Sequence, residues 1–406
     1  MADQKIYIFA LAAQGEGISG SDRIFTEFAR NWSKGNKVEI FVSGDGYKMC
    51  LRQGLSKSNI KYKRSLRSDD LQISNMRKWG NFGFVVGYIA RIFIGVKIGL
   101  TLRLENDSST VVYSASEFWM DSLPAVILKL RYSKIKWLAA WYQTAPNPVK
   151  GFTEDGKNAR YRIYALIYYF MQFPIKPLIR RYANFVLVNN ENEKRVFLEH
   201  AEKDQAIVVY GAVDLEQIRK WKAKNKGLPK IYDAVFQGRF HPQKGVMELI
   251  EIWKLVVGQK PNAKLVLIGD GPLRKNIEKK IKDLGLINNV LLKGYLFDGG
   301  EKYKIFSQSK IVVHPSFFDS GGIAAYEAMA FGLPCVGFNL SSYRNYFPSG
   351  MLKVRVGELK EFAGKILQLL SDKLLYTKVQ KEAKSLISDS FSWKYRSRQI
   401  LDQVLE

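Results

Sequence analysis

Cysteine and histidine are scarce in this chain, and their scarcity limits the chemistry to be considered. The only cysteines are Cys50 and Cys335, and the three histidines are His200, His241 and His314. Two cysteines so far apart support neither a disulfide framework nor a metal site, so a reducing cytoplasm is the expected compartment. The histidines lack metal-ligand spacing and no Asp-x-Asp motif occurs. We therefore predict no bound metal and no cofactor.

Low-complexity stretches and a basic leader sequence are also lacking. The chain has 406 residues, of which 47% are hydrophobic, enough for ordered packing in two domains. The apolar run from Ile6 to Ala13 has no positively charged segment before it, because Asp3 offsets Lys5. We interpret this run as the first strand of a domain and not as a signal peptide. Apolar strand-like and helix-like segments then alternate throughout, which predicts an α/β fold with parallel sheets covered on both faces.

A basic turn follows an apolar strand in the second half of the chain. The segment GRFHPQKG at 238–245 comes directly after Ala234 to Phe236 and before an apolar-periodic helix that starts near Val246. Arg239 and Lys244 are therefore expected at the carboxyl end of a parallel strand, which is where phosphate binds in doubly wound sheets.

A glycine-rich loop with a carboxylate on either side forms the second notable segment. The loop lies between a strand-like run, Ile311 to Val313, and a helix that starts near Ile323. Its glycines let backbone amides approach a ligand closely. Asp319 lies beside the loop and Glu327 one turn into the helix, so we expect both to face one small ligand. Carboxylates accept paired hydrogen bonds from vicinal hydroxyls, which a sugar or a ribose offers.

Six segments, in order, resemble the motifs of one enzyme family. GRFHPQKG resembles the G-R-x4-K-G element of retaining GT-B glycosyltransferases, and DSGGIAAYEAMAFGLP at 319–334 resembles their E-x7-E element; glycosyltransferase family 4 is the most similar group. The other four segments are IYIFALAAQGEGISGSDR at 6–23, VVYGAVD at 208–214, LVLIGDGP at 265–272 and FSW at 391–393. Each is weak alone, but their common order makes coincidence improbable.

This resemblance implies the GT-B fold, in which two Rossmann-like doubly wound domains face each other across a cleft where the substrates meet. Residues 1–212 would form the N-terminal acceptor-binding domain. Residues 213–389 would form the C-terminal nucleotide-sugar-binding domain, and the terminal helix, 390–406, would pack back on the first domain.

The resemblance also implies an activity: transfer of a hexose-type sugar from a nucleotide-diphosphate sugar, such as a UDP-sugar or GDP-sugar, to an acceptor hydroxyl with retention of configuration. Arg239 and Lys244 would neutralise the charge that develops on the leaving phosphate. Glu327 would hold the ribose and Asp319 would touch the donor sugar. The positions implied to bind the nucleotide sugar are Gly20, Gly238, Arg239, Lys244, Asp319, Gly321, Gly322, Ile323 and Glu327. Arg239, Lys244 and Asp319 would be the catalytic residues.

Two departures from the family pattern concern the sugar pocket. The first carboxylate is Asp319 where a Glu is usual, and Ser320-Gly321 replaces the usual Gly-Phe. Many relatives also have a His after the strand that here ends at Ala140, and none occurs at that place. Tyr142 or Gln143 are the residues left to bond the donor sugar there.

The charge of the chain points to an anionic partner. Its 63 basic and 38 acidic residues leave a net charge of +25. Nucleic acid is not expected, because no recognisable binding module is present. Two apolar, aromatic stretches, Phe82 to Leu100 and Arg160 to Tyr182, instead suit the headgroup layer of an anionic membrane. The basic residues near these stretches are Lys61, Lys63, Arg64, Arg67, Arg160, Arg162, Arg180 and Arg181.

Neither stretch is expected to cross a membrane. Arg91 lies near the middle of the first stretch with Lys97 close by, and a charge at the centre of a spanning helix costs about 2.5–3.5 kcal/mol. Pro174 and Pro177 interrupt the second stretch. Two interpretations remain: core helices of the first domain, or segments in direct contact with a membrane surface.

The expected protein is a cytoplasmic glycosyltransferase, peripheral on the inner face of the membrane. Its acceptor would be a lipid-linked or membrane glycan, as in polysaccharide, lipopolysaccharide or glycolipid biosynthesis. Two alternatives are a GT-B sugar-nucleotide epimerase and a non-catalytic basic scaffold or nucleic-acid-binding protein.

Overall fold

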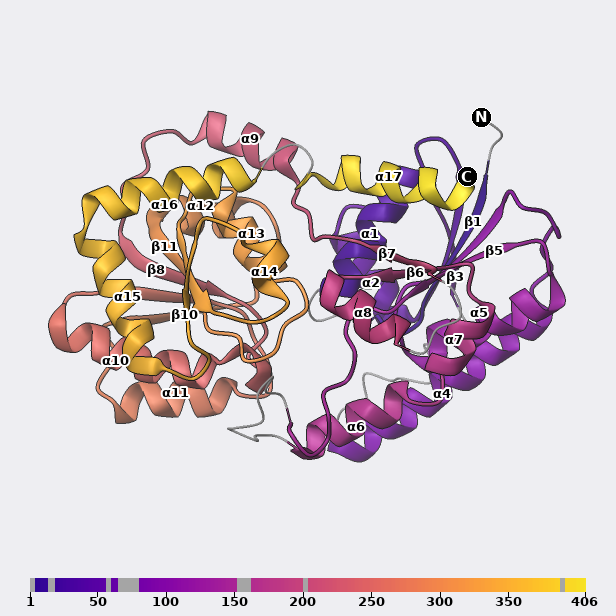
Figure 1. Ribbon diagram of the computed structural model, residues 1–406, viewed down its shortest axis with the longest axis horizontal. Coiled ribbons are helices and arrows are strands. Elements are labelled where there is room, and N and C mark those ends of the chain that lie inside the picture. The colour runs from indigo at the N-terminus through magenta and orange to yellow at the C-terminus, as the bar shows by residue number, and fades with distance from the viewer. Residues whose placement is uncertain are drawn as a thin grey trace. The chain divides into compact units, whose positions relative to one another are not determined.

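The computed structural model divides the chain into two compact units (Figure 1). The described residues are 4–13, 19–55, 60–64, 80–151, 162–199, 204–387 and 391–406. Unit 1 consists of the described parts of Met1–Ala145, Ile167–Val209 and Trp393–Glu406. Unit 2 consists of the described parts of Pro146–Leu166 and Tyr210–Ser392. The expected boundary at 212 assigned residues 146–166 to the first domain, whereas here their described part groups with unit 2.

Unit 1 is built on a seven-stranded parallel sheet of largely buried, apolar strands. In sheet order the strands are β3 (Ile60–Arg64), β2 (Lys37–Val42), β1 (Lys5–Ala10), β4 (Thr110–Ser114), β5 (Lys136–Ala140), β6 (Phe185–Val188) and β7 (Ala206–Val208). Phe9 of β1 pairs in register with Phe41 of β2, and their rings stack with centroids 4.7 Å apart. Side chains of this kind leave no polar face, so helices must cover both sides of the sheet.

The helices of unit 1 include the C-terminal one. They are α1 (Gly20–Trp32), α2 (Gly44–Arg52), α4 (Gly80–Thr101), α5 (Trp119–Arg131), α6 (Arg162–Gln172), α7 (Lys176–Tyr182), α8 (Glu191–Leu198) and α17 (Trp393–Leu405), with the residues of α6 up to Leu166 grouping with unit 2. The indole N–H of Trp32 donates to the carbonyl of Ser397 at 2.7 Å. The terminal helix therefore packs against α1.

Unit 2 has a six-stranded parallel sheet. Its strands, in sheet order, are β10 (Val290–Gly294), β9 (Leu265–Ile268), β8 (Tyr232–Gln237), β11 (Ser309–His314), β12 (Cys335–Phe338) and β13 (Met351–Val354). Its helices are α9 (Leu215–Lys224), α10 (Val246–Gln259), α11 (Arg274–Asp283), α12 (Gly300–Gln308), α13 (Ile323–Met329), α14 (Tyr343–Tyr346), α15 (Leu359–Ser371) and α16 (Lys373–Leu386).

Successive residues of β8 enter different cores of unit 2. Ala234 and Phe236 pack in the core that contains residues of α10 and α15. Val235 packs in the core that contains residues of α12 and α13. This alternation is the period-2 pattern of a strand covered on both faces, and it confirms the predicted α/β architecture of this half of the chain.

Each sheet has one point where the strand order reverses. In unit 1 the reversal falls between β1 and β4, and in unit 2 between β8 and β11. Loops that leave the carboxyl ends of two such strands diverge to opposite sides and leave a crevice, which is where ligands bind in open α/β sheets. The segments 238–245 and 315–322 follow β8 and β11, so the fold brings both notable loops to the reversal point of unit 2.

The two apolar stretches form helices that belong to the units. The first stretch forms α4, which packs on α5. The second contains α6 and α7, with Pro174 between the helices and Pro177 in the first turn of α7. Among the described residues, no helix is long and apolar enough to cross a membrane.

Candidate active site

The loop after β8 is fixed tightly against the loop after β11. Gly245 adopts a left-handed conformation with φ of 63°, and a Cβ at this position would lie 1.9 Å from the carbonyl oxygen of Pro315. The amides of Phe317 and Phe318 both donate to the carbonyl of Gln243, at 2.8 and 3.3 Å. Only glycine fits the backbone approach at 245, so the geometry of the turn depends on this residue.

This contact brings Lys244 and Asp319 together. The Lys244 ammonium lies 2.5 Å from Oδ2 of Asp319, and His314 Nε2 lies 3.2 Å from the same oxygen. Burial alone would raise the pKa of Asp319, but the charge of Lys244 and the hydrogen bond with His314 outweigh it and hold that pKa well below its usual range. Asp319 is therefore an ionised acceptor near neutral pH. The sequence analysis assigned His314 no role in the site, and its contact with Asp319 was not predicted.

The glycine amides next to Asp319 close a turn around its carboxylate. The amides of Gly321 and Gly322 each lie 3.3 Å from Oδ1 of Asp319. Gly322 is left-handed, with φ of 58°, and directly precedes Ile323 at the start of α13. These amides were expected to donate to a phosphate or a sugar, and in this structure the carboxylate of Asp319 accepts from them.

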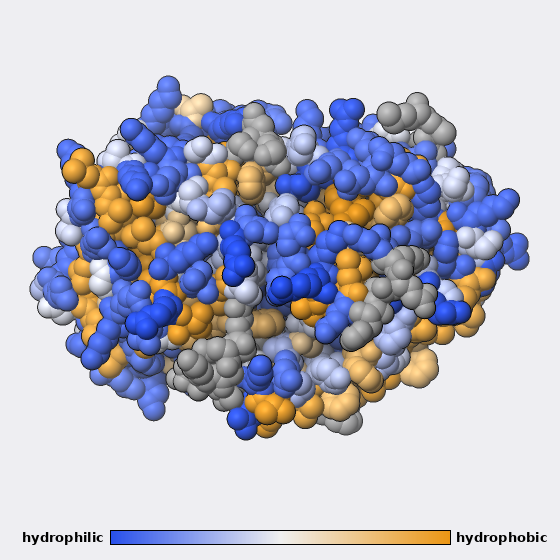
Figure 2. All heavy atoms as spheres, in the orientation of Figure 1, coloured by the Kyte–Doolittle hydropathy of each residue, from blue (hydrophilic) through white to orange (hydrophobic). Residues whose placement is uncertain are grey.

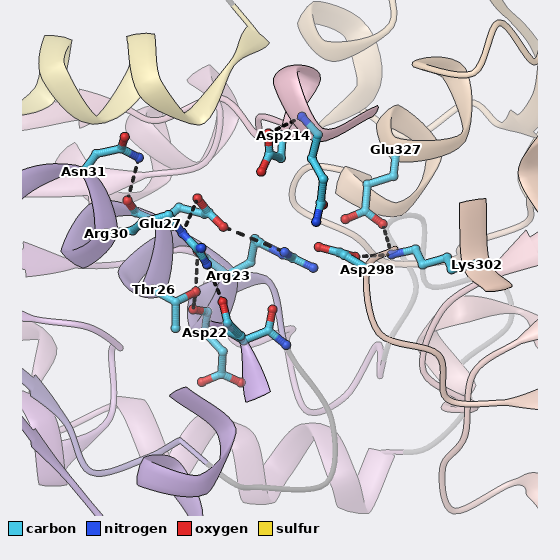
Figure 3. A network of polar contacts seen from close by, with 12 residues as sticks. Asp22, Arg23, Thr26, Glu27, Arg30, Asn31, Asp214, Asp298, Lys302 and Glu327 are labelled. Carbon is cyan, nitrogen blue, oxygen red and sulfur yellow. Dashed lines mark hydrogen bonds and ion pairs between the residues drawn. The ribbon is translucent and has the colours of Figure 1, made fainter. Parts of the chain in front are cut away.

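Glu327 lies one turn into α13, as predicted, and side chains of unit 2 hold its carboxylate. Gln237, the last residue of β8, donates to Oε2 of Glu327 at 2.7 Å, and the Lys302 ammonium lies 2.5 Å from the same oxygen. Lys302 is only 2% exposed and also pairs with Asp298 at 2.7 Å. Figure 3 shows Lys302 between the two carboxylates. A lysine within a helix resembles a surface residue in the sequence, so the position of Lys302 was not predicted.

Arg239 differs from Lys244 in its side-chain partners. Arg239 is an exposed residue, and its side chain makes no hydrogen bond or ion pair with any residue in the described part of the chain. Partial burial of the guanidinium lowers its pKa from the ordinary value. Gly238, which precedes Arg239, directly follows β8, and its amide donates to the carbonyl of Ile268 at 3.0 Å. Burial, and then the charges of Arg239 and Lys244, lower the pKa of nearby His241 to about 4. The loop therefore presents one exposed cation, one paired cation and a neutral histidine.

Gly20 opens the first helix of unit 1. Ser19 caps α1 by accepting from the Asp22 amide, and Asp22 in turn accepts from the Ser19 amide at 2.9 Å. Ion pairs along α1 join Glu27 to Arg23 and Arg30 (Figure 3). Residues 14–18 of the preceding loop lie outside the described residues.

Tyr142 is tied into the core of unit 1. It is 3% exposed, and its hydroxyl lies 2.5 Å from the hydroxyl of Tyr113. Gln143 is half-buried, and its carbonyl accepts from the amide of Gln172 at 2.7 Å. Of the two residues left to bond the donor sugar in place of the usual His, Gln143 is thus the more accessible.

A buried carboxylate, Glu193, supports the loop after β5. Its Oε2 accepts from the amide and the hydroxyl of Thr144, at 3.0 and 2.7 Å. Burial raises the pKa of Glu193 from 4.5 to about 7, although the bonds from Thr144 oppose this rise. Since the folded-state pKa exceeds the unfolded one, the folded protein retains the proton between these values. The stabilisation is complete below pH 4.5 and is lost as the pH rises through 7.

Glu193→Gln is therefore expected to become more stable relative to wild type as the pH rises. The difference in unfolding free energy between variant and wild type should increase from pH 5 to pH 8 by up to about 3 kcal/mol. Denaturant unfolding at both pH values measures it, with Glu191→Gln at the exposed start of α8 as the matched control. A pH-independent difference would contradict the assignment.

Together the two doubly wound parallel sheets define a two-domain α/β fold of the GT-B class. Residues 217–386 match the family model "Glycosyl transferases group 1". The structure of HepE from Anabaena in complex with UDP and glucose superposes with a TM-score of 0.70 at 16% identity, covering 99% of both chains. The GT-B fold expected from the sequence is confirmed.

Curated relatives are similar over part of their length. The poly(ribitol-phosphate) alpha-N-acetylglucosaminyltransferase of Staphylococcus aureus is 27% identical over 53% of this chain and 46% of its own. The UDP-Gal:alpha-D-GlcNAc-diphosphoundecaprenol alpha-1,3-galactosyltransferase of Escherichia coli is 26% identical over 54% of this chain and 59% of its own. The chain spans about half the length of the curated relatives it matches. These comparisons support a glycosyltransferase and do not favour the epimerase or scaffold alternatives.

Proposed function

We propose that this protein is a retaining glycosyltransferase of family 4 that moves a hexose-type sugar from a UDP-sugar or GDP-sugar to a hydroxyl of a lipid-linked or membrane glycan. The observation that carries the proposal is the arrangement at the strand-order reversal of unit 2. There Arg239, whose guanidinium has no partner among the described residues, lies in the same short loop as Lys244, which is paired with the ionised Asp319.

The leaving nucleoside diphosphate gains negative charge as its bond to the sugar breaks. Arg239, with no protein partner among the described residues, is available to bind the diphosphate, and Lys244 adds a second positive charge in the same loop. Asp319 is held ionised and accepts hydrogen bonds, which suits contact with sugar hydroxyls. The carboxylate of Glu327, oriented through Oε2 by Gln237 and Lys302, suits the paired hydroxyls of a ribose.

The acceptor part of the proposal rests on the relatives and on charge. The Escherichia coli relative is named for a diphosphoundecaprenol-linked acceptor. A net charge of +25 favours an anionic surface, so we place the reaction at the inner face of a membrane. Of the basic residues singled out in the sequence, Arg67 and Arg160 lie outside the described residues, as do the side chains of Lys61, Lys63 and Arg64.

A thermal-shift panel of UDP, GDP and ADP, each with its sugar conjugates, tests the proposed donor. Either UDP or GDP should stabilise the protein by about 2.7 kcal/mol when it is present at 100 times its dissociation constant. ADP serves as the control for a general diphosphate effect. If no nucleotide shifts the melting temperature, or if all three do so equally, the assignment of a UDP-sugar or GDP-sugar donor is wrong.

A further inference from the structure

The outward face of α4 is apolar and exposed. Val85, Ile89, Phe93 and Leu100 lie on it, each between 46% and 69% exposed. They are separated by four, four and seven residues, so they form one stripe along the helix. Scattered apolar residues on a surface are ordinary, but a continuous stripe of large ones marks an interaction site.

The opposite face of α4 packs closely against α5, so α4 cannot rotate to bury the stripe. A Cβ at Gly95 would lie 2.6 Å from the carbonyl oxygen of Met120, and one at Gly99 would lie 3.0 Å from Cα of Pro124. Arg91 also lies on this inner side: it is 5% exposed and its Nε donates to the carbonyl of Gly87 at 3.0 Å. The two interpretations of this stretch are therefore not exclusive, because one face of the helix is core and the other is exposed.

A neighbouring helix extends the apolar surface. The Tyr88 hydroxyl of α4 donates to the carbonyl of Met171 in α6 at 3.3 Å, which places the two helices side by side. Ile167, Phe170 and Phe173, in and just after α6, are each at least 47% exposed. We call the exposed apolar residues of both helices the apolar ridge: Val85, Ile89, Phe93, Leu100, Ile167, Phe170 and Phe173. Figure 2 shows apolar side chains gathered over α4 and α6.

We propose that the apolar ridge inserts shallowly into the headgroup and upper acyl region of an anionic bilayer. Charge identifies this occupant: no Asp or Glu occurs in residues 80–101 or 162–182, whereas the basic residues Lys97, Arg162 and Arg181 are exposed there. Carboxylates are repelled by anionic headgroups, and aromatic residues with Lys and Arg at their margins are typical of a membrane interface. A helix that lies in the interface buries only one face, as the inward Arg91 requires.

The biological role of this contact rests on the proposed function, because insertion would hold unit 1 at the surface where a lipid-linked acceptor lies.

The salt dependence of vesicle binding distinguishes two sources of membrane affinity. Attraction between surface charges is screened by salt, whereas burial of apolar side chains is not. High salt should therefore weaken but not abolish binding to the bilayer.

Co-sedimentation of the full chain with vesicles tests the ridge. Phosphatidylcholine vesicles with and without phosphatidylglycerol are compared at low and high salt. The double variant Phe93→Ser/Phe170→Ser should partition into the mixed vesicles at least about tenfold less than wild type, because each side chain buries a large apolar surface on insertion. The binding that wild type retains at high salt should disappear. Leu374→Ser, which replaces an 85% exposed leucine of α16 in unit 2, is the matched control and should bind as wild type.

A labelling experiment tests the membrane contact of the ridge even if the double serine variant does not express or fold. Both native cysteines are buried, so Phe93→Cys and Leu374→Cys can each carry an environment-sensitive dye. The dye at position 93 should shift to shorter emission wavelength with mixed vesicles, and the dye at position 374 should not.

Three results would overturn the inference: unchanged vesicle binding by the double variant, no emission shift at position 93, or self-association of wild type that the double variant loses while neither binds vesicles. The last result would make the ridge an interface between copies of the chain. Nucleotide thermal shifts of the double variant should equal those of wild type. If no nucleotide shifts the melting temperature of wild type although the ridge binds vesicles, the proposed enzyme function is wrong, whereas the proposed membrane contact of the ridge is still supported.

Discussion

Arg239→Ala is expected to lower the turnover number by about 10²–10³-fold without lowering the stability of the protein. Removal of one donor that stabilises developing charge in a preorganised site typically costs this much in rate. Stability should be unaffected because Arg239 is an exposed residue and its guanidinium pairs with no described residue. The measurement is release of nucleoside diphosphate from the sugar nucleotide that gives a thermal shift, with a membrane-lipid extract supplying the acceptor.

Arg398→Ala is the control for this experiment, because it removes an 81% exposed guanidinium on α17. It should leave the turnover number unchanged. Arg239→Lys should recover part of the rate, since a lysine keeps the charge but loses the paired donors of the guanidinium. Wild-type turnover in Arg239→Ala would refute the role of this residue in binding the diphosphate.

Lys244→Ala is expected to differ from Arg239→Ala, although the two residues have the same predicted role. It should lower the rate comparably, and it should also destabilise unit 2, because the buried Asp319 loses the cation 2.5 Å away. Adding Asp319→Asn to Lys244→Ala removes the uncompensated charge, so the double variant should regain stability without regaining activity. If the double variant regained wild-type turnover, Lys244 would have only a structural role.

The sequence was sufficient to predict the strand, the turn and the helices that hold the residues of this site. A strand, a basic turn and an apolar-periodic helix could be recognised at 232–259 because each follows from near neighbours in the chain. The start of α13 near Ile323 and the position of Glu327 one turn later were predictable for the same reason. The terminal helix, predicted at 390–406, is α17 (Trp393–Leu405).

The contacts between segments were not predictable in the same way. Lys244 and Asp319 are 75 residues apart, and they meet because β8 and β11 are adjacent in the sheet while their loops touch at Gly245. Lys302 is buried because Glu327 and Asp298 offset its charge, a condition that only tertiary packing creates. Composition likewise could not choose between core and membrane surface for α4, because apolar residues lie on both of its faces. Ile94 packs in the core, whereas Ile89 and Phe93 are exposed.

Glu327→Gln and Asp319→Asn are expected to impair different parts of donor binding. The ribose is common to the donor and to the bare nucleoside diphosphate, so Glu327→Gln should weaken both. Hydrogen bonds to a charged group contribute about 1.5–3 kcal/mol, which corresponds to roughly 10–150-fold in dissociation constant. Asp319→Asn should leave the affinity for the bare nucleotide nearly unchanged and should impair use of the sugar nucleotide, since its carboxylate is predicted to meet the sugar.

Calorimetry with the bare nucleotide, its 2′-deoxy analogue and the sugar nucleotide separates these roles. Loss of the 2′-hydroxyl should cost wild type most of the affinity that Glu327→Gln loses, and it should cost Glu327→Gln little, because the variant no longer offers a charged acceptor to the hydroxyl pair. Lys302 keeps a partner in Asp298 when Glu327 becomes neutral, so the variant is expected to stay folded. If both variants lose affinity for the bare nucleotide equally, or if the 2′-deoxy analogue binds wild type as well as the parent nucleotide does, then Glu327 does not hold the ribose and the division of roles between the two carboxylates is wrong.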